Sequence, residues 1–143
     1  MRHKFYFGLL LIFFLENTNL FAQNFWVPDY AFRTKLKQLY PTCFTAQDSL
    51  ITNCSQIQNA INLNVSGLSI YSLNGLHYFS SLDSLNCNYN FLNSLPLLPA
   101  SLTKLYCTGN SLASLPILPT SLTKLICNVN QLNSLPTLTP TLE

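Results

Sequence analysis

The chain has 143 residues, of which 48% are hydrophobic, 13% aromatic and only 8% charged, with a formal net charge of +2 at neutral pH. Without the leader residues Arg2, Lys4 and Glu16, discussed next, the seven basic and five acidic residues become five and four. Such a chain lacks the basic footprint of a nucleic-acid-binding protein, and its solubility has to rest on its many Asn, Ser and Thr side chains.

Residues 1–22 have the layout of a secretory signal peptide. Basic residues precede an apolar run from Phe5 to Leu15, and small and polar residues follow up to Ala22. The run is too short to span a bilayer comfortably, and no later stretch is apolar enough for a transmembrane helix. We therefore expect a secreted or cell-surface protein without a membrane span once the leader is removed; a retained anchor is the alternative.

Residues 23–59 contain no repeat and are expected to form an N-terminal cap. Pro28 and Asp29 are typical of a helix start, and Pro41 is typical of a helix stop. An amphipathic helix between them, laid over the first coil of a repeat array, would shield the open apolar end of that array. Its apolar residues at helical spacing are Phe32, Leu36, Leu39 and Tyr40. Its expected solvated face consists of Asp29, Arg33 and Lys37.

Two cysteines of the cap, Cys43 and Cys54, flank a turn-like segment at 45–49. In an exported protein such a pair is expected to form a disulfide bond. A metal site is the weaker interpretation, because two cysteines without a nearby histidine supply too few ligands. We therefore predict a disulfide between Cys43 and Cys54 and no metal.

Residues 81–140 contain one twenty-residue pattern three times, without insertion or deletion. The copies begin at Leu82, Leu102 and Leu122 and share the frame L-x-x-L-x-C-x-x-N-x-L-x-x-L-P. A divergent first copy fits this frame after a step of 22 residues, with Leu68 in place of the Asn. Three matched copies of so long a frame predict a stacked repeat architecture. The repeats are expected at 60–81, 82–101, 102–121 and 122–141, with the start of a further repeat at 142.

Each copy alternates apolar and polar residues, as a half-buried strand does, and then contains prolines that forbid a helix. In the middle copy Leu105 and Cys107 would face the interior, and Pro116 and Pro119 would keep the return side extended. One copy cannot fold alone, because its few buried side chains do not offset the entropy of ordering about twenty residues. Stacking closes this deficit and would place parallel strands ~4.8 Å apart.

The asparagines at the same place in three copies stand where the chain turns off the strand. We expect each side-chain amide to be buried and bonded to the backbone of that turn. A row of exposed ligand-binding amides is the alternative. These ladder asparagines are Asn90, Asn110 and Asn130.

Cysteine recurs at one inward strand position, at Cys87, Cys107 and Cys127. A metal or redox ladder is one interpretation of this spacing. A stack of small buried hydrophobic residues is the better one, because in-register Cβ atoms ~4.8 Å apart exceed the usual disulfide range. We expect three buried free thiols.

No constellation typical of catalysis occurs in the sequence. His77 is the only histidine after the leader and has no acidic neighbour in the sequence. Neither a glycine-rich phosphate loop nor a nucleophile elbow is present. We therefore expect no enzyme activity, no catalytic residue and no cofactor, with His77 at the surface of the first repeat.

The frame is the leucine-rich repeat pattern, and the chain resembles secreted leucine-rich repeat proteins of Bacteroidetes. The frame over 81–140, extended to L-P-x-L-P, carries the resemblance, together with a cap-like opening from Val27-Pro28-Asp29 to Cys43-Phe44. The resemblance implies a leucine-rich repeat solenoid with short parallel β-strands on the concave face, a mostly extended or loop convex side and an N-terminal helical cap. The frame is also similar to the repeats of effectors of enteric pathogens, some of which carry a ubiquitin-ligase domain.

We expect a secreted, non-catalytic, monomeric interaction module that binds a protein or glycan through the concave face. The alternatives are spacer repeats of a longer cell-surface protein and the N-terminal repeats of a truncated effector enzyme. The candidate ligand-binding residues are Asn86, Asn88, Lys104, Tyr106, Thr108, Lys124 and Asn128. The same face would include Asn62, Asn64, Ser66, Ser84 and Ile126.

Overall fold

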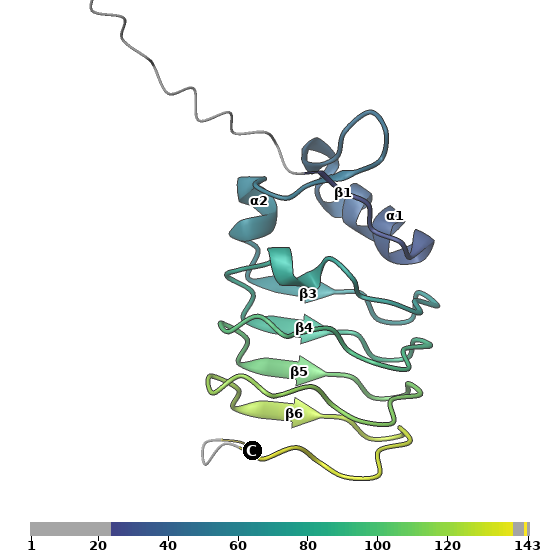
Figure 1. Cartoon of the computed structure of the whole chain (residues 1–143), viewed down its shortest axis with the longest axis vertical. Coiled ribbons are helices and arrows are strands. Elements are labelled where there is room, and N and C mark those ends of the chain that lie inside the picture. Colours follow the sequence, from purple (N-terminus) through teal and green to yellow (C-terminus); the bar gives the residue numbers. More distant parts are fainter. Residues whose placement is uncertain (1–23, 139–141, 143) are drawn as a thin grey trace, which may run out of the picture.

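The computed structural model describes residues 24–138 and residue 142, so the signal peptide expected at 1–22 lies outside the described residues. The described chain is a column of stacked coils with a helical cap at its N-terminal end (Figure 1). In chain order the elements are β1 (Asn24–Phe25), α1 (Tyr30–Leu39), the 3-10 helix η1 (Pro41–Cys43), β2 (Leu50–Ile51), α2 (Ser55–Gln58), β3 (Asn62–Asn64), the 3-10 helix η2 (Leu76–Tyr78), β4 (Ser84–Asn86), β5 (Lys104–Tyr106) and β6 (Lys124–Ile126).

Strands β3 to β6 form one parallel sheet in the order of the chain. Leu63 pairs with Leu85, Leu85 with Leu105, and Leu105 with Leu125. The register therefore advances by 22 residues between the first two coils and by 20 residues afterwards. This confirms the repeat spacing read from the sequence.

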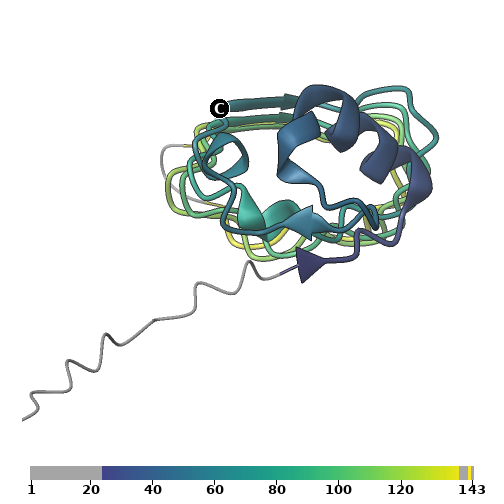
Figure 2. The ribbon, with the colours of Figure 1, turned by 90° about the horizontal axis from the view of Figure 1, so that it is seen from above.

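The return sides of the coils are mostly irregular. Residues 60–138 contain no α-helix, as the prolines predict, and the first coil makes a helical turn, η2, where its sequence lacks proline. Along the column axis the coils superpose as one flattened ring with the parallel sheet on one side (Figure 2).

One apolar core runs from the cap into the fourth coil. The inward strand residues Leu63, Leu85 and Leu105 are buried, whereas Leu125 of the fourth coil is only partly buried. Burial therefore depends on having a stacked coil on both sides. Leu142, where a further repeat was expected to start, also packs against the edge of this core.

Asp29 joins the cap helix to the first coil. Its Oδ1 atom accepts the Phe32 N–H at 2.8 Å and so caps α1. Its Oδ2 atom accepts the backbone N–H groups of Tyr71 and Ser72, at 2.8 and 3.2 Å. One carboxylate thus starts the helix and fixes it to the array.

The prediction of a solvated face made of Asp29, Arg33 and Lys37 is therefore wrong for Asp29 and Arg33, whereas Lys37 keeps 41% of its side chain exposed. All three are partly buried. The Arg33 Nη1 atom donates to the Val27 carbonyl at 2.6 Å, and Lys37 pairs with the Asp48 carboxylate. Helical spacing identified the charged side of α1, but it could not show that neighbouring loops fold back against that side.

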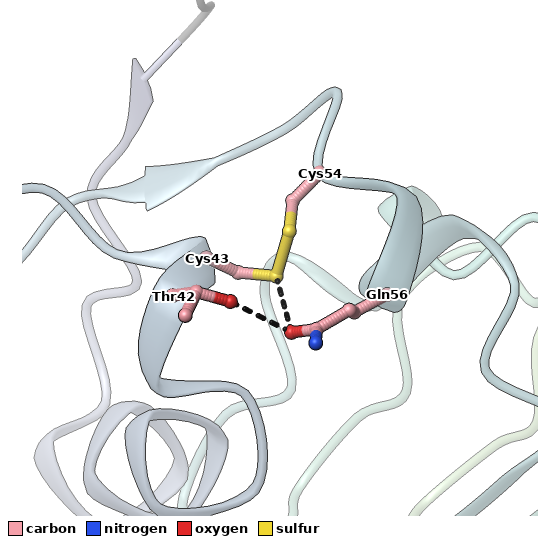
Figure 3. The surroundings of a disulfide bond; sticks show 4 residues. All are labelled: Thr42, Cys43, Cys54 and Gln56. Atoms are coloured by element: carbon pink, nitrogen blue, oxygen red, sulfur yellow. Dashed lines mark hydrogen bonds between the residues drawn. A yellow bond between two sulfur atoms is a disulfide. The ribbon is translucent and has the colours of Figure 1, made fainter.

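A disulfide bond closes the cap. Cys43, in η1, is bonded to Cys54, with 5.5 Å between their Cα atoms (Figure 3). This is the pairing predicted from the sequence. Beside it the Thr42 hydroxyl donates to Gln56 Oε1 at 2.9 Å, so η1 and α2 are also joined by a hydrogen bond (Figure 3). The bonds hold the segment leading into β3 against the end of α1.

Candidate partner-binding face

The outer side of the parallel sheet, here called the sheet face, carries the candidate residues predicted from the sequence. Because successive side chains of a strand alternate between faces, Leu85 and Leu105 point inward and their neighbours point outward. The structure brings the predicted residues together on this one surface, and none of them is buried. The sheet face consists of Asn62, Asn64, Ser66, Ser84, Asn86, Asn88, Lys104, Tyr106, Thr108, Lys124, Ile126 and Asn128.

Three asparagines of the sheet face are oriented by backbone donors. The Oδ1 atom of Asn64 accepts the Ser66 N–H at 3.1 Å, and that of Asn86 accepts the Asn88 N–H at 3.1 Å. The Oδ1 atom of Asn88 accepts the Thr108 N–H at 2.7 Å, across to the next coil. Within the described residues the Nδ2 groups of these side chains have no hydrogen-bond acceptor. They remain as donors to a ligand.

The charges of the sheet face are mostly positive. Lys104 lies 3.4 Å from Asp83, whose carboxylate also accepts the Thr103 hydroxyl at 2.6 Å. The Thr103 hydrogen bond and then the nearby Lys104 lower the pKa of Asp83, so this carboxylate stays ionised. The Lys124 ammonium lies 6.0 Å from the Tyr106 ring centroid. The face thus presents the Lys124 ammonium and a Lys104 ammonium that is paired with Asp83.

Helix α1 overhangs strand β3 and forms a cleft with it, here called the cap cleft. The cleft has a volume of about 420 Å³. The helix contributes the Lys35 ammonium and the apolar Leu39 side chain. Tyr40, which follows the helix, contributes a phenol whose pKa is raised by burial. Leu39 was expected in the core, but it is 42% exposed and lines this cleft. The lining residues are Lys35, Leu39, Tyr40, Asn62, Asn64, Ser66 and Leu68.

Sequence reasoning missed the three cap residues of this cleft, Lys35, Leu39 and Tyr40. The helical period shows which residues share a side of α1, but not how the helix lies over the sheet. A signal did exist: Leu68, at the ladder position of the first repeat, is apolar where the other copies carry Asn. This side chain is only partly buried and lines the cleft.

The ladder asparagines are bonded to backbone, not displayed to solvent as a row. Asn90 donates to the carbonyls of Val65, Cys87 and Asn88, and its Oδ1 atom accepts the N–H groups of Leu68 and Ile70. Asn110 and Asn130 repeat the three donor bonds, and each accepts one backbone N–H from the preceding coil. Full burial was expected for all three but holds for Asn90 alone, since Asn110 and Asn130 are partly exposed.

The repeat cysteines are free, and their burial decreases along the column. Cys87 and Cys107 are buried, whereas Cys127 is partly exposed, so the expectation of three buried thiols is wrong for the last one. Burial raises the pKa of Cys87 far above its ordinary range and that of Cys107 to about 12, and in each case the next thiol adds to the shift. Such thiols stay protonated and unreactive at neutral pH.

The described residues hold no group of three or more side chains that could bind a metal ion. His77, the histidine of the first repeat, is exposed on the 3-10 helix η2. No helix among the described residues has the length and apolar character needed to cross a membrane.

Comparison with solved structures identifies the fold. A structure titled "Structure of Shigella effector LRR domain" superposes with a TM-score of 0.57 and 38% sequence identity, over 60% of this chain and 39% of that one. The repeats form a leucine-rich repeat domain. This chain spans less than half the length of the Shigella chain that it matches. No protein-family model and no curated protein matches the sequence.

Proposed function

We propose that the leucine-rich repeat domain is a non-catalytic module that binds a partner protein through the sheet face and the cap cleft. The observation that carries this proposal is the row of oriented amide donors on adjacent strands, which ends at a cleft of about 420 Å³. A cleft that adjoins an open sheet surface fits an extended polypeptide segment better than a compact small molecule.

The chemistry of this surface favours an acidic segment. Lys35 in the cap cleft and Lys104 and Lys124 along the strands give it positive charge. Amide donors suit the carbonyls of an extended chain, and Leu39 offers contact for one apolar side chain. A glycan fits this face less well, because Tyr106 is its one aromatic side chain and is only partly exposed.

We propose further that the protein is exported and that it is of the secreted Bacteroidetes type. The signal-peptide layout of 1–22 supports export, and so does the disulfide in the cap, because such bonds persist in oxidising compartments. The Shigella domain that this chain matches belongs to an effector. This supports a second candidate role, in which the repeats recognise the target for an effector of greater length.

The proposal is tested by selecting peptides that bind the wild-type domain from a random library and measuring their affinity by calorimetry. We expect peptides rich in Asp and Glu. The variant K104A/Y106A should weaken their binding by at least about tenfold, or about 1.4 kcal/mol. The variant K35A/L39A should do the same through the cleft.

The matched control is I117S, on the opposite side of the coil, where Ile117 is 84% exposed. It should leave the affinity unchanged. Each variant is also melted, so that a loss of folding is not taken for a loss of contact. Peptides that bind both double variants as tightly as the wild type would move the binding site to another face.

A further inference from the structure

We propose that this protein has a second binding surface, separate from the sheet face, which takes a neutral β-linked glycan by stacking on aromatic rings. Five aromatic side chains, each more than half exposed, lie where α1 begins and on the loops that follow strands β3 and β4. In Figure 1 the start of α1 overhangs the ends of these strands on the same side of the column. This aromatic strip consists of Trp26, Tyr30, Tyr71, Phe91 and Tyr89.

The strip is continuous from the cap into the coils. The Arg33 guanidinium lies 4.2 Å from the ring centroid of Trp26 and 5.6 Å from that of Tyr30. The backbone of Tyr71 lies beside the start of α1, because its N–H is bonded to Asp29, the residue before Tyr30. The rings of Tyr71 and Phe91 lie 5.2 Å apart with 35° between their planes. These contacts hold the rings in place before any ligand arrives.

Tyr89 displays its ring from a turn with a left-handed backbone. It stands directly before the ladder Asn with a φ of 54°, in the left-handed region that favours glycine. The first and third coils have Gly67 and Gly109 at this place, with φ of 67° and 68°. The fourth coil has Val129 there, with a φ of 55°, so the left-handed backbone belongs to the turn and the aromatic ring is what distinguishes Tyr89.

Gly109 seats the Tyr89 ring. A Cβ atom added at Gly109 would lie 2.6 Å from Cδ1 of Tyr89, so this ring packs directly over the glycine backbone of the next coil. Any larger side chain there would push the ring away. Tyr89 and Gly109 together therefore hold one exposed aromatic ring in a fixed position.

The charge of the strip selects the class of ligand. The Asp29 carboxylate is fully engaged by three backbone N–H groups, and Arg33 is held by Trp26 and by the Val27 carbonyl. The strip therefore offers ring faces and exposed hydroxyls such as Ser69 and Ser111, without a free ionic group. A glycan of β-linked glucose is complementary, since its ring hydroxyls are all equatorial and its C–H groups face the negative π-cloud.

The test uses cellohexaose and the fluorescence of Trp26, which is the single tryptophan of the chain and belongs to the strip. Titration of the wild-type protein should give a saturable change in emission. Tyr71→Ser and Tyr89→Gly should each weaken binding by at least about tenfold. Tyr89→Gly should melt at the same or a higher temperature than the wild type, because glycine removes the strain while the ring is lost.

The matched control is Val129→Gly, which makes the same backbone change in the fourth coil, where Val129 has a φ of 55° and carries no ring. It should leave glycan binding unchanged. The proposal is overturned if the wild type does not bind cellohexaose, or if Tyr71→Ser and Tyr89→Gly bind it as well as the wild type. It is also overturned if these two variants lose binding to a protein partner while no glycan binds, since the strip would then be a protein interface.

Discussion

The second coil, 82–101, and the fourth, 122–138, follow the same frame of residues but differ in burial. In the second coil Cys87 is fully buried and Asn90 is 4% exposed. In the fourth, the equivalent Cys127 and Asn130 are partly exposed, although Asn130 makes the same three donor bonds to backbone. The second coil lies between two others, whereas β6 is the last strand among the described residues.

The difference shows that the sequence of a coil determines its backbone conformation, whereas the neighbouring coils determine how far its side chains are shielded from water. A repeat supplies the inward leucine, the cysteine and the asparagine, but the next coil supplies the atoms that exclude water from them. Stability in this domain is therefore a property of interfaces between coils. Equivalent substitutions in different coils should have unequal effects.

The largest contrast is expected for the inward leucines. Leu105 is fully buried, so Leu105→Ala should lower the free energy of unfolding by about 2–5 kcal/mol through lost burial and a cavity. Leu125→Ala, at the same position in the fourth coil, should cost less than half as much because that side chain is partly exposed. Urea unfolding measures both. Equal losses would mean that stacking does not determine the contribution of a coil.

A smaller contrast is expected for the ladder asparagines. Asn90→Ala leaves buried backbone groups unpaired, including the N–H groups of Leu68 and Ile70, at about 1–3 kcal/mol for each buried group. Asn130→Ala should cost less, because water can reach that turn. Thermal melting compares the two. Neither change should alter peptide binding at the sheet face; an intact melting temperature with lost binding would instead make these asparagines ligand residues.

Two substitutions of Asp29 separate its helix-capping hydrogen bond from its hydrogen bonds to the first coil. Asp29→Ala should cost about 1–2 kcal/mol, since it removes the helix cap and the bonds to Tyr71 and Ser72. Asn also caps helices well, so Asp29→Asn should keep the bond to Phe32 and lose only the joint to the first coil. Melting temperatures should rank wild type, Asn, Ala. Full stability of both variants would show that the cap does not depend on this carboxylate.

A further contrast appears only at alkaline pH and is absent at neutral pH. The pKa of Cys107 is raised from 9.0 to about 12, so the unfolded chain loses this proton well before the folded chain does. The stability from the neutral thiol is present below pH 9.0 and is lost as the pH rises towards 12, by at most about 1.4 kcal/mol per pH unit. Cys107→Ala should flatten this decline, measured by urea unfolding across the range, more than Cys127→Ala does. Identical slopes would contradict the burial of Cys107.

Much of the fold could be predicted from the sequence, because the same pattern of residues occurs in three matched copies. The frame predicted the strands and the register from Leu63 to Leu125. The helix capped by Asp29 was predicted separately, from the start and stop residues of the cap. The cap residues of the cleft could not be predicted, since Lys35 and Leu39 reach it only through the way α1 lies over β3.

The joint made by Asp29 was also missed, because its partners at Tyr71 and Ser72 lie more than forty residues away and are backbone groups. The left-handed backbone at Tyr89 was also missed, although Gly67 and Gly109 stand at the equivalent places of the first and third coils. Local pattern thus determined the coils, and the features that depend on contacts between distant segments required the structure.

The most direct test of the account is the rate at which the repeat thiols of the native protein react with iodoacetamide, read by mass spectrometry. The partly exposed Cys127 should be labelled first, and the fully buried Cys87 and Cys107 only when the domain unfolds. Cys43 and Cys54 should stay unlabelled as the disulfide. Equal labelling of Cys87 and Cys127, or a native crosslink between two repeat cysteines, would contradict the claim that stacked neighbours determine burial in this domain.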